Sequence, residues 1–357
     1  SGQPSSIPSQ DPSNVDIDPE LKSKFQDRSL RGFFRTQTVE KEEVLVKLES
    51  YKERPETIEE MKNQASKSQS PLLKMAEKNP NVEVKQTLWI ANAVLLEAPT
   101  NFPLENIASV QGVESLNVNA EVKALQSETA SGSEVTPQAS NTYGLNQINA
   151  TQTWNQFDTR GGGVKVSVID TGVDIDHNDI DLFTTDEADP TYPGGWAEFN
   201  GGKVDGSEPK VCPHFGGDHG THVSGTVSGG NASGMNIGVA PNVTLMNVGA
   251  LMAENAEGNC VGSITDIASA MEWSVQNDAD ILSMSLGAPG KFNTFIDSVR
   301  NAESAGVIVI GAAGNSGEGT SISPSNVYDA TAIGASDSNE DIASFSSGEE
   351  IDTSQAW

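Results

Sequence analysis

Asp170, His219 and Asn315 are the residues whose types and positions could do chemistry. Asp170 follows the apolar run of residues 164–169, so its carboxylate is expected at the end of a buried strand. His219 stands between an acidic residue and a glycine, and the small residues of 220–226 suit a tightly packed helix. Asn315 comes after the apolar run 307–311. A carboxylate, an imidazole and an amide in such places could orient a proton shuttle and stabilise an oxyanion.

Each of these residues also has an ordinary structural interpretation. Asp170 could form the turn before Thr171 and Gly172, and His219 taken alone would more often be a satisfied structural histidine. Asn315 could belong to a Gly-Asn turn. Their succession along the chain, each at a strand end or a helix start, is more specific than any one of them.

The elements that must position these residues follow a regular alternation after residue 141. Short apolar strands are expected at 164–169, 243–248, 280–286, 307–311 and 330–335. Between them, helices are expected directly after His219 and over 264–275 and 292–305. This alternation predicts an open, mostly parallel α/β sheet, in which ligands bind outside the carboxyl ends of the strands.

Six strings in this region carry a resemblance to the subtilisin-like serine proteases, the subtilases. They are VIDTGVD at 168–174, HGTHVSGT at 219–226, GVAP at 238–241, SMSLG at 283–287, AAGN at 312–315 and ASFSS at 343–347. They run in the family's order over about 200 residues. The resemblance implies the family's three-layer, mostly parallel α/β sheet, here incomplete, over residues 141–357, and a hydrolase acting on peptide bonds.

The resemblance also assigns roles residue by residue. Asp170 resembles the carboxylate that fixes the imidazole, His219 the general base, His222 the motif's structural histidine and Asn315 the oxyanion donor. The implied substrate-binding residues are Ser285, Leu286 and Gly287 on one side, Ala313 and Gly314 on the opposite pocket wall, and Gly262 on the second pairing strand. There, Cys260-Val261-Gly262 replaces the family's usual Gly-x-Gly.

The family's nucleophile motif, Gly-Thr-Ser-Met-Ala, does not occur up to Trp357. Gly319-Thr320-Ser321 is a poor substitute, because it follows Asn315 by only a few residues and precedes Ile-Ser-Pro-Ser. We therefore expect a serine endopeptidase with an Asp-His-Ser triad whose serine is missing here, so that this chain by itself is inactive. The alternative is a non-catalytic, peptide-binding subtilase-like protein, which sequence beyond Trp357 would discriminate. A nucleotide-binding domain is disfavoured, because no Gly-rich phosphate loop follows the first strand.

Upstream, composition divides the chain further. Residues 1–28 are rich in Ser, Pro and Gln and are expected to be a disordered leader. Residues 29–125 give the order β-α-β-β-α-β of an α+β, ferredoxin-like domain, and Ser70-Pro71 is expected to interrupt its long helix. This domain resembles the propeptides of secreted subtilases, which inhibit the enzyme with their C-terminal tail; the alternative is an unrelated ferredoxin-like domain. Residues 126–140 have linker composition and are expected to hold the processing junction.

Charge and cysteine content limit the partners. The net charge is −29, and residues after 140 carry 6 basic against 29 acidic side chains. Such a surface repels nucleic acid and anionic membranes, and no apolar run approaches the roughly 18 residues of a membrane span. An ordinary acidic protein and a salt-adapted, halophilic one both fit. We expect a secreted monomer that binds polypeptide substrates and its own propeptide. Cys212 and Cys260 allow one disulfide or two free thiols.

Catalysis of this kind needs no cofactor, but a structural calcium ion is a further possibility implied by the resemblance. Asp179 matches a carboxylate ligand of a family calcium site, and residues 230–236 have the position and length of its binding loop. The loop's side-chain ligand position holds Ala232, with Asn231 beside it. A solvated acidic loop explains the same residues.

Overall fold

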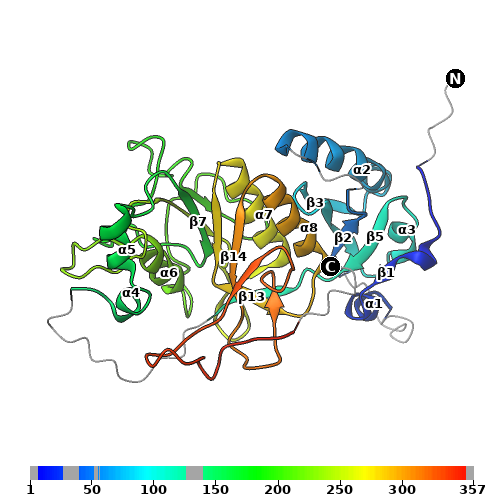
Figure 1. Ribbon diagram of the computed structural model, residues 1–357. Helices are drawn as coiled ribbons and strands as arrows, with labels where there is room; N and C mark the ends of the chain where they lie inside the picture. The colour runs from blue at the N-terminus through cyan, green and yellow to red at the C-terminus, as the bar shows by residue number, and fades with distance from the viewer. Residues whose placement is uncertain (1–6, 27–39, 52–54, 56, 126–139, 351–357) are drawn as a thin grey trace. The chain divides into compact units, whose positions relative to one another are not determined.

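The computed structural model describes residues 7–26, 40–51, 55, 57–125 and 140–350 (Figure 1). The chain forms two compact units, residues 1–120 and residues 121–357, called here the N-terminal and C-terminal units. Among the described residues, no helix is both long enough and apolar enough to cross a membrane.

The N-terminal unit is a five-stranded sheet with its helices packed on one face. Its elements are η1 (Pro12–Asn14), β1 (Asp16–Ile17), α1 (Pro19–Gln26), β2 (Lys41–Leu48), α2 (Ile58–Lys78), β3 (Glu83–Leu88), β4 (Ala93–Pro99), α3 (Leu104–Ala108) and β5 (Val113–Asn117). The strand order is β1-β5-β2-β4-β3. Alternate residues of β2 and β4, such as Val44 and Val94, share one core with Leu72 of α2 and Ile107 of α3. Both helices therefore cover the same sheet face.

Three expectations for this region differ from the structure. Part of the expected disordered leader is folded: Leu21 of α1 is fully buried in the core, while β1 adds a strand beside β5. The apolar residues of this stretch are too sparse to give a clear period. Helix α2 continues through Pro71, which therefore does not end it. The boundary between the units falls at residue 120 rather than 125, because the next strand joins the other unit.

A six-stranded parallel sheet forms the centre of the C-terminal unit, as the alternation of strands and helices predicts. Its order is β16-β14-β12-β7-β9-β8. The strands are β7 (Lys165–Asp170), β8 (Trp196–Glu198), β9 (Thr244–Gly249), β12 (Ile281–Met284), β14 (Ile308–Ala312) and β16 (Thr331–Ile333). Every pairing between neighbouring strands is parallel. The carboxyl ends of β7 and β14 therefore lie at the same edge.

Helices lie on both faces of this sheet. Ser167 of β7 hydrogen-bonds to Ser274 of α7 (Ile264–Gln276), whereas Val168 packs with Val223 of α6 (His219–Ser228). Successive strand residues point to opposite faces, so α6 covers one face and α7 the other. Helix α8 (Asn293–Ser304) packs beside α7 and β14. Figure 1 shows α6 on the side of β7 away from α7 and α8.

The α6 face is covered unevenly. Ile308 and Ile333 are 53% and 51% exposed on that face, whereas Leu282 and Val309 on the opposite face are almost completely buried. Among the described residues, α6 covers β7 and β9, and the apolar side chains of β14 and β16 on this face stay open to solvent.

The remaining elements complete the unit. They are α4 (Tyr143–Gln147) and α5 (Ala150–Phe157), with the strands β6 (Glu121–Ala124), β10 (Ala253–Glu254), β11 (Cys260–Ser263), β13 (Leu286–Pro289) and β15 (Ile322–Ser323). These strands form a second sheet in the order β10-β11-β6-β13-β15. Strand β6 is its central strand, antiparallel to both neighbours.

Candidate active site

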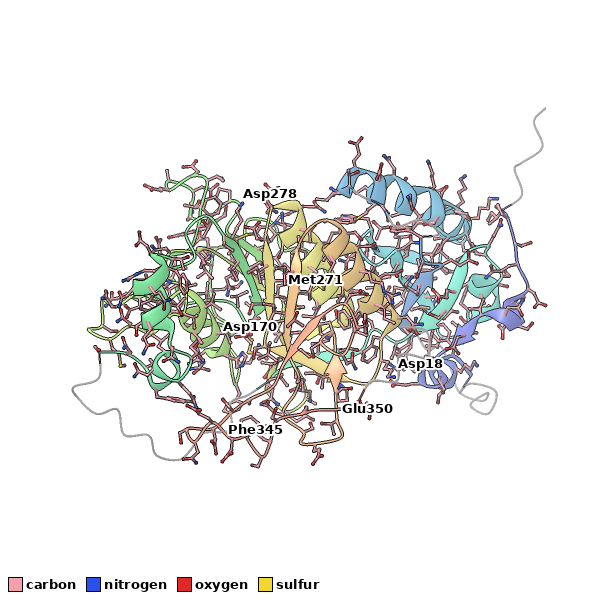
Figure 2. All side chains as sticks on the ribbon, in the orientation of Figure 1. Asp18, Asp170, Met271, Asp278, Phe345 and Glu350 are labelled. Carbon is pink, nitrogen blue, oxygen red and sulfur yellow. A yellow bond between two sulfur atoms is a disulfide. The ribbon has the colours of Figure 1, made fainter. Side chains whose placement is uncertain are left out.

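Asp170 is the last residue of β7 and is fully buried. Its Oδ1 lies 2.8 Å from Nδ1 of His219 and accepts a hydrogen bond of 2.7 Å from the Thr171 N–H. The chain turns sharply afterwards at Gly172, which has a φ of +92° and where a Cβ would lie 2.0 Å from the Lys210 carbonyl oxygen. Figure 2 shows Asp170 near one edge of the sheet and Asp278, which precedes β12, near the other. The carboxylate thus stands at the carboxyl edge.

His219 begins α6, and small residues bring that helix close to β7. A Cβ on Gly220 would lie 2.2 Å from the Gly172 carbonyl oxygen and 3.1 Å from Cβ of Asp170, so only glycine fits there. The Thr171 hydroxyl accepts a 2.9 Å hydrogen bond from the Gly220 N–H. This approach places the imidazole, 11% exposed, against the carboxylate. The motif's glycine is therefore needed for packing as much as for room around the ring.

The other ring nitrogen of His219 faces a backbone carbonyl. Nε2 lies 3.0 Å from the oxygen of Leu125, the residue that follows β6. The imidazole stands between two acceptors, and it can donate to both only when both nitrogens carry a proton. Burial lowers the pKa of His219, but the hydrogen bond and charge of Asp170, the Leu125 carbonyl and the charge of Asp218 together raise that pKa above its ordinary value.

Strand β6 lies where the resemblance places the substrate backbone. It pairs with β13 through Leu286↔Ala124 and Gly287↔Lys123, and the Leu125 N–H donates to the Ser285 carbonyl oxygen at 2.9 Å. On its other side it pairs with β11 through Val261↔Lys123 and Gly262↔Val122. Main-chain pairing thus holds β6 on both edges, and the carbonyl of Leu125 at its end faces His219.

Glycines on both flanking strands pack closely against segments of the unit other than β6. A Cβ on Gly262 would lie 2.0 Å from the Ala250 carbonyl oxygen, and one on Gly287 would lie 2.5 Å from the Ile322 side chain. The strand pairings and the Leu125–Ser285 hydrogen bond bring all of the expected residues Ser285, Leu286, Gly287 and Gly262 to residues 121–125. Cys260-Val261-Gly262, which replaces the family's usual Gly-x-Gly, still forms a strand that pairs regularly with β6.

Asn315, Ala313 and Gly314 follow β14 at the carboxyl edge, the same edge at which Asp170 ends β7. Gly314 has a φ of +121° and lies so close to Ser347 that a Cβ would be 2.6 Å from its Oγ. The Ala313 N–H donates to the Ile333 carbonyl oxygen. The strand order thus places this loop two strands away from Asp170.

No serine hydroxyl in the described part of the chain hydrogen-bonds to His219. Ser321, the nearest match to a Gly-Thr-Ser motif, donates to the carboxylate of Glu349 at 2.5 Å. Its use as nucleophile, which the sequence disfavours, gains no support from this geometry.

Asp179 holds a loop directly. Its carboxylate accepts hydrogen bonds from the N–H groups of Ala232 (2.5 Å) and Ser233 (3.3 Å), and its backbone oxygen accepts one from the Gly230 N–H. Burial raises the pKa of Asp179, but these hydrogen bonds outweigh it and the pKa lies below its ordinary value. The described residues contain no group of three or more His, Cys, Asp or Glu that could hold a metal ion. Both oxygens of the Asp179 carboxylate accept hydrogen bonds from the backbone of this loop, and we assign no step to a metal.

A cavity of about 1010 Å³ lies beside α6, and no residue of β6 lines it. His222, Thr226 and Asp174 line it, together with Tyr143 of α4. His222 therefore faces a space that His219 does not line.

The subtilase family model matches residues 161–357, more than half of the chain and all of the parallel sheet. The chain belongs to the subtilase family. An alkaline protease of Alkalihalobacillus alcalophilus is 32% identical over 279 residues, which cover 78% of this chain and 66% of that protein. Subtilisin Savinase of Lederbergia lenta is 36% identical over 204 residues, 57% of this chain and 66% of the relative. Alkaline elastase YaB of a Bacillus species is 34% identical over 236 residues, 66% of this chain and 55% of the relative.

The matches to this subtilase chain cover 55% to 66% of the length of these relatives. The alkaline protease match covers 78% of the chain, so it must extend upstream of the family model's first residue, 161.

Sequence reasoning missed two features of the site. The first is that residues 121–125 lie between β11 and β13; their alternation of polar and apolar residues, Glu-Val-Lys-Ala-Leu, was the available signal. The second is a disulfide between Cys212 and Cys260, which the sequence left open. The state of the two cysteines could not be decided from sequence, because only the fold shows whether residues 48 positions apart in sequence approach each other.

Proposed function

We propose that this subtilase domain is a serine endopeptidase that hydrolyses polypeptides, with His219 as its general base and Asp170 as the carboxylate that orients it. The observation that carries the proposal is the 2.8 Å contact between Asp170 Oδ1 and His219 Nδ1 at the carboxyl edge of the sheet. Asp170 fixes the tautomer that has Nδ1–H, which leaves Nε2 free to take a proton from a hydroxyl nucleophile. The names of the relatives, alkaline protease and subtilisin, agree with this activity.

The substrate would take the path that β6 now follows. Its backbone would pair with β13 through Ser285 and Gly287 and with β11 through Gly262, as β6 does. Asn315 would donate to the oxyanion that forms when the scissile carbonyl is attacked, and Ala313 and Gly314 would line the pocket beside it. The nucleophile would be a serine outside the described residues.

We further propose that the N-terminal unit and β6 form an inhibitory proregion, which makes the protein a zymogen. The Leu125 carbonyl oxygen lies 3.0 Å from His219 Nε2, and the Leu125 N–H donates to the Ser285 carbonyl oxygen, which supports Leu125 as the residue before the processed bond. Self-processing would break the C–N bond between Leu125 and Gln126, and water would supply the hydroxyl of the new carboxylate and a proton to the new amine. This junction lies at the upstream end of the linker 126–140 expected from composition.

The disulfide supports an oxidising compartment, since such bonds persist mainly in secreted proteins. We therefore propose secretion, as a monomer. The acidic surface, with a net charge of −29, supports adaptation to high salt.

The test is labelling of the full-length gene product with a serine-directed fluorophosphonate, followed by identification of the labelled residue. Labelling of one serine, abolished in His219→Ala, supports the peptidase. Specific binding of extended peptides with neither labelling nor cleavage would favour the alternative, a non-catalytic peptide-binding protein.

A further inference from the structure

The disulfide between Cys212 and Cys260 joins the loop before α6 to β11, two segments that the isolated β-bridge Phe215↔Asn259 also connects. Its two cysteines are 48 residues apart in sequence, and their Cα atoms are 6.3 Å apart. Both side chains are nearly fully buried and form a small apolar cluster with Met252. Cys212 lies in the loop before α6, and Cys260 is the first residue of β11.

At one end, the disulfide is tied to the backbone that carries Asp170. The Cys212 N–H donates to the Thr171 carbonyl oxygen at 2.8 Å. Thr171 in turn donates its hydroxyl to the Gly217 carbonyl oxygen and accepts the Gly220 N–H. The position of Cys212 is therefore fixed relative to Asp170 and the first turn of α6.

At the other end, the disulfide anchors the first residue of β11. In the described residues β11 pairs with β6 on one side and with the two-residue strand β10 on the other. The Cys260 N–H donates to the Phe215 carbonyl oxygen at 3.0 Å, close to Cys212 in sequence. When β6 leaves the cleft, β11 keeps the β10 pairs, two backbone hydrogen bonds between Phe215 and residues 258–260, its direct junction with α7 and the disulfide. A short strand of this kind is marginally stable alone, so the disulfide adds to these supports.

We propose that the Cys212–Cys260 disulfide is a positioning element, which holds β11 at a fixed place relative to the Asp170–His219 pair so that it can pair with a peptide substrate. The proposal rests on the proposed function of β11 as a substrate-pairing strand. It follows that the disulfide affects the binding of only those substrates that are long enough to reach β11.

The register of β6 says which substrates those are. Val122 and Lys123 pair with β11, while Leu125 contacts Ser285 and His219. A peptide anilide with four residues before the scissile bond spans both regions. A blocked single-residue leucine ester reaches only the region of Ser285 and His219.

The experiment compares these two substrates in the oxidised full-length protein and in the double variant Cys212→Ser/Cys260→Ser. We expect KM for the four-residue anilide to rise about tenfold, the effect of losing one or two strand hydrogen bonds, with kcat nearly unchanged. Both constants for the leucine ester should stay the same. Met252→Leu is the matched control, since it changes the packing around the sulfurs and keeps the disulfide; it should leave both substrates unaffected.

If the double variant fails to fold, the same comparison is made on folded protein that has been reduced and alkylated. An equal loss on both substrates, or no loss on either, would overturn the positioning role. A protein that cleaves neither substrate while oxidised would instead contradict the proposed peptidase function, so the two failures are distinguishable.

Discussion

His219 Nε2 lies 3.0 Å from the Leu125 carbonyl oxygen, so the histidine that should accept a proton is engaged by a strand of its own chain. The opposite ring nitrogen faces the Asp170 carboxylate at 2.8 Å. A neutral imidazole has one N–H and can satisfy only one of these acceptors. Binding of β6 and its Leu125 carbonyl therefore stabilises the protonated form of His219, and protonation of His219 stabilises the bound strand.

This relationship predicts that the retention of β6 between β11 and β13 depends on pH. Burial opposes protonation of His219, but Asp170, Leu125 and Asp218 raise its pKa in the bound state. A raised pKa stabilises the bound state fully below the ordinary histidine value of about 6.5, and that stabilisation is lost as the pH rises through the raised pKa. The strand should be released more readily at alkaline pH.

Nuclear magnetic resonance titration of the His219 ring measures this effect. Val122→Asp places a charge at a fully buried position of β6 and should displace the strand, so the pKa of His219 should fall in that variant. Asp218→Asn measures the contribution of the other nearby charge. It should lower the pKa of His219 while β6 stays in place. An unchanged pKa in Val122→Asp would contradict the linkage.

Processing at Leu125 is tested by substitution of that residue. Leu125→Pro removes the N–H that donates to Ser285, so cleavage of the Leu125–Gln126 bond should fall by at least about tenfold. Lys123→Ala, an exposed side chain on the same strand, should be cleaved like the natural chain. N-terminal sequencing and mass spectrometry of the processed product supply the readout. A product beginning at a residue other than Gln126 in the natural chain would refute this junction.

Asp179 should stabilise the loop at 230–236 without a metal. Asp179→Asn weakens the hydrogen bonds to Ala232 and Ser233 and should lower the free energy of unfolding by about 1–3 kcal/mol. Because the carboxylate has a lowered pKa, its contribution is present above the ordinary aspartate value of about 3.9 and is lost as the pH falls through the lowered one. A strong chelator should leave the melting temperature of the natural chain unchanged. A fall of several degrees on chelation would instead point to a bound cation.

Salt dependence follows from the net charge of −29. Lowering the salt to about 0.01 M lengthens the screening distance to about 30 Å, so acidic side chains repel one another across the molecule. The melting temperature should therefore fall steeply with decreasing salt. Circular dichroism in a salt series measures it, and a variant with several exposed Glu changed to Gln should lose part of the dependence. A melting temperature that does not respond to salt would remove the case for salt adaptation.

The Asp170–His219 pair could be expected from sequence because both residues lie in local motifs that fix a strand end and a helix start. The parallel sheet was equally accessible, since its strands and helices alternate clearly. The place of β6 was not, because its partners Gly262 and Gly287 lie more than a hundred residues downstream and residues 121–125 carry only a short alternation. Folding of α1 was missed because Leu21 and Phe25 are the two large apolar residues of an otherwise polar helix.

The most direct measurement is kcat/KM of the full-length protein for an extended peptide anilide, compared with His219→Ala and with Asp170→Asn. Loss of a positioned general base should lower kcat/KM by about 10²–10⁴-fold in His219→Ala, and Asp170→Asn should also lower it by misplacing the Nδ1 proton. His222→Ala is the control and should keep the activity if the variant is folded. Unchanged kcat/KM in a folded His219→Ala protein would contradict the assignment of this site as a subtilase active centre.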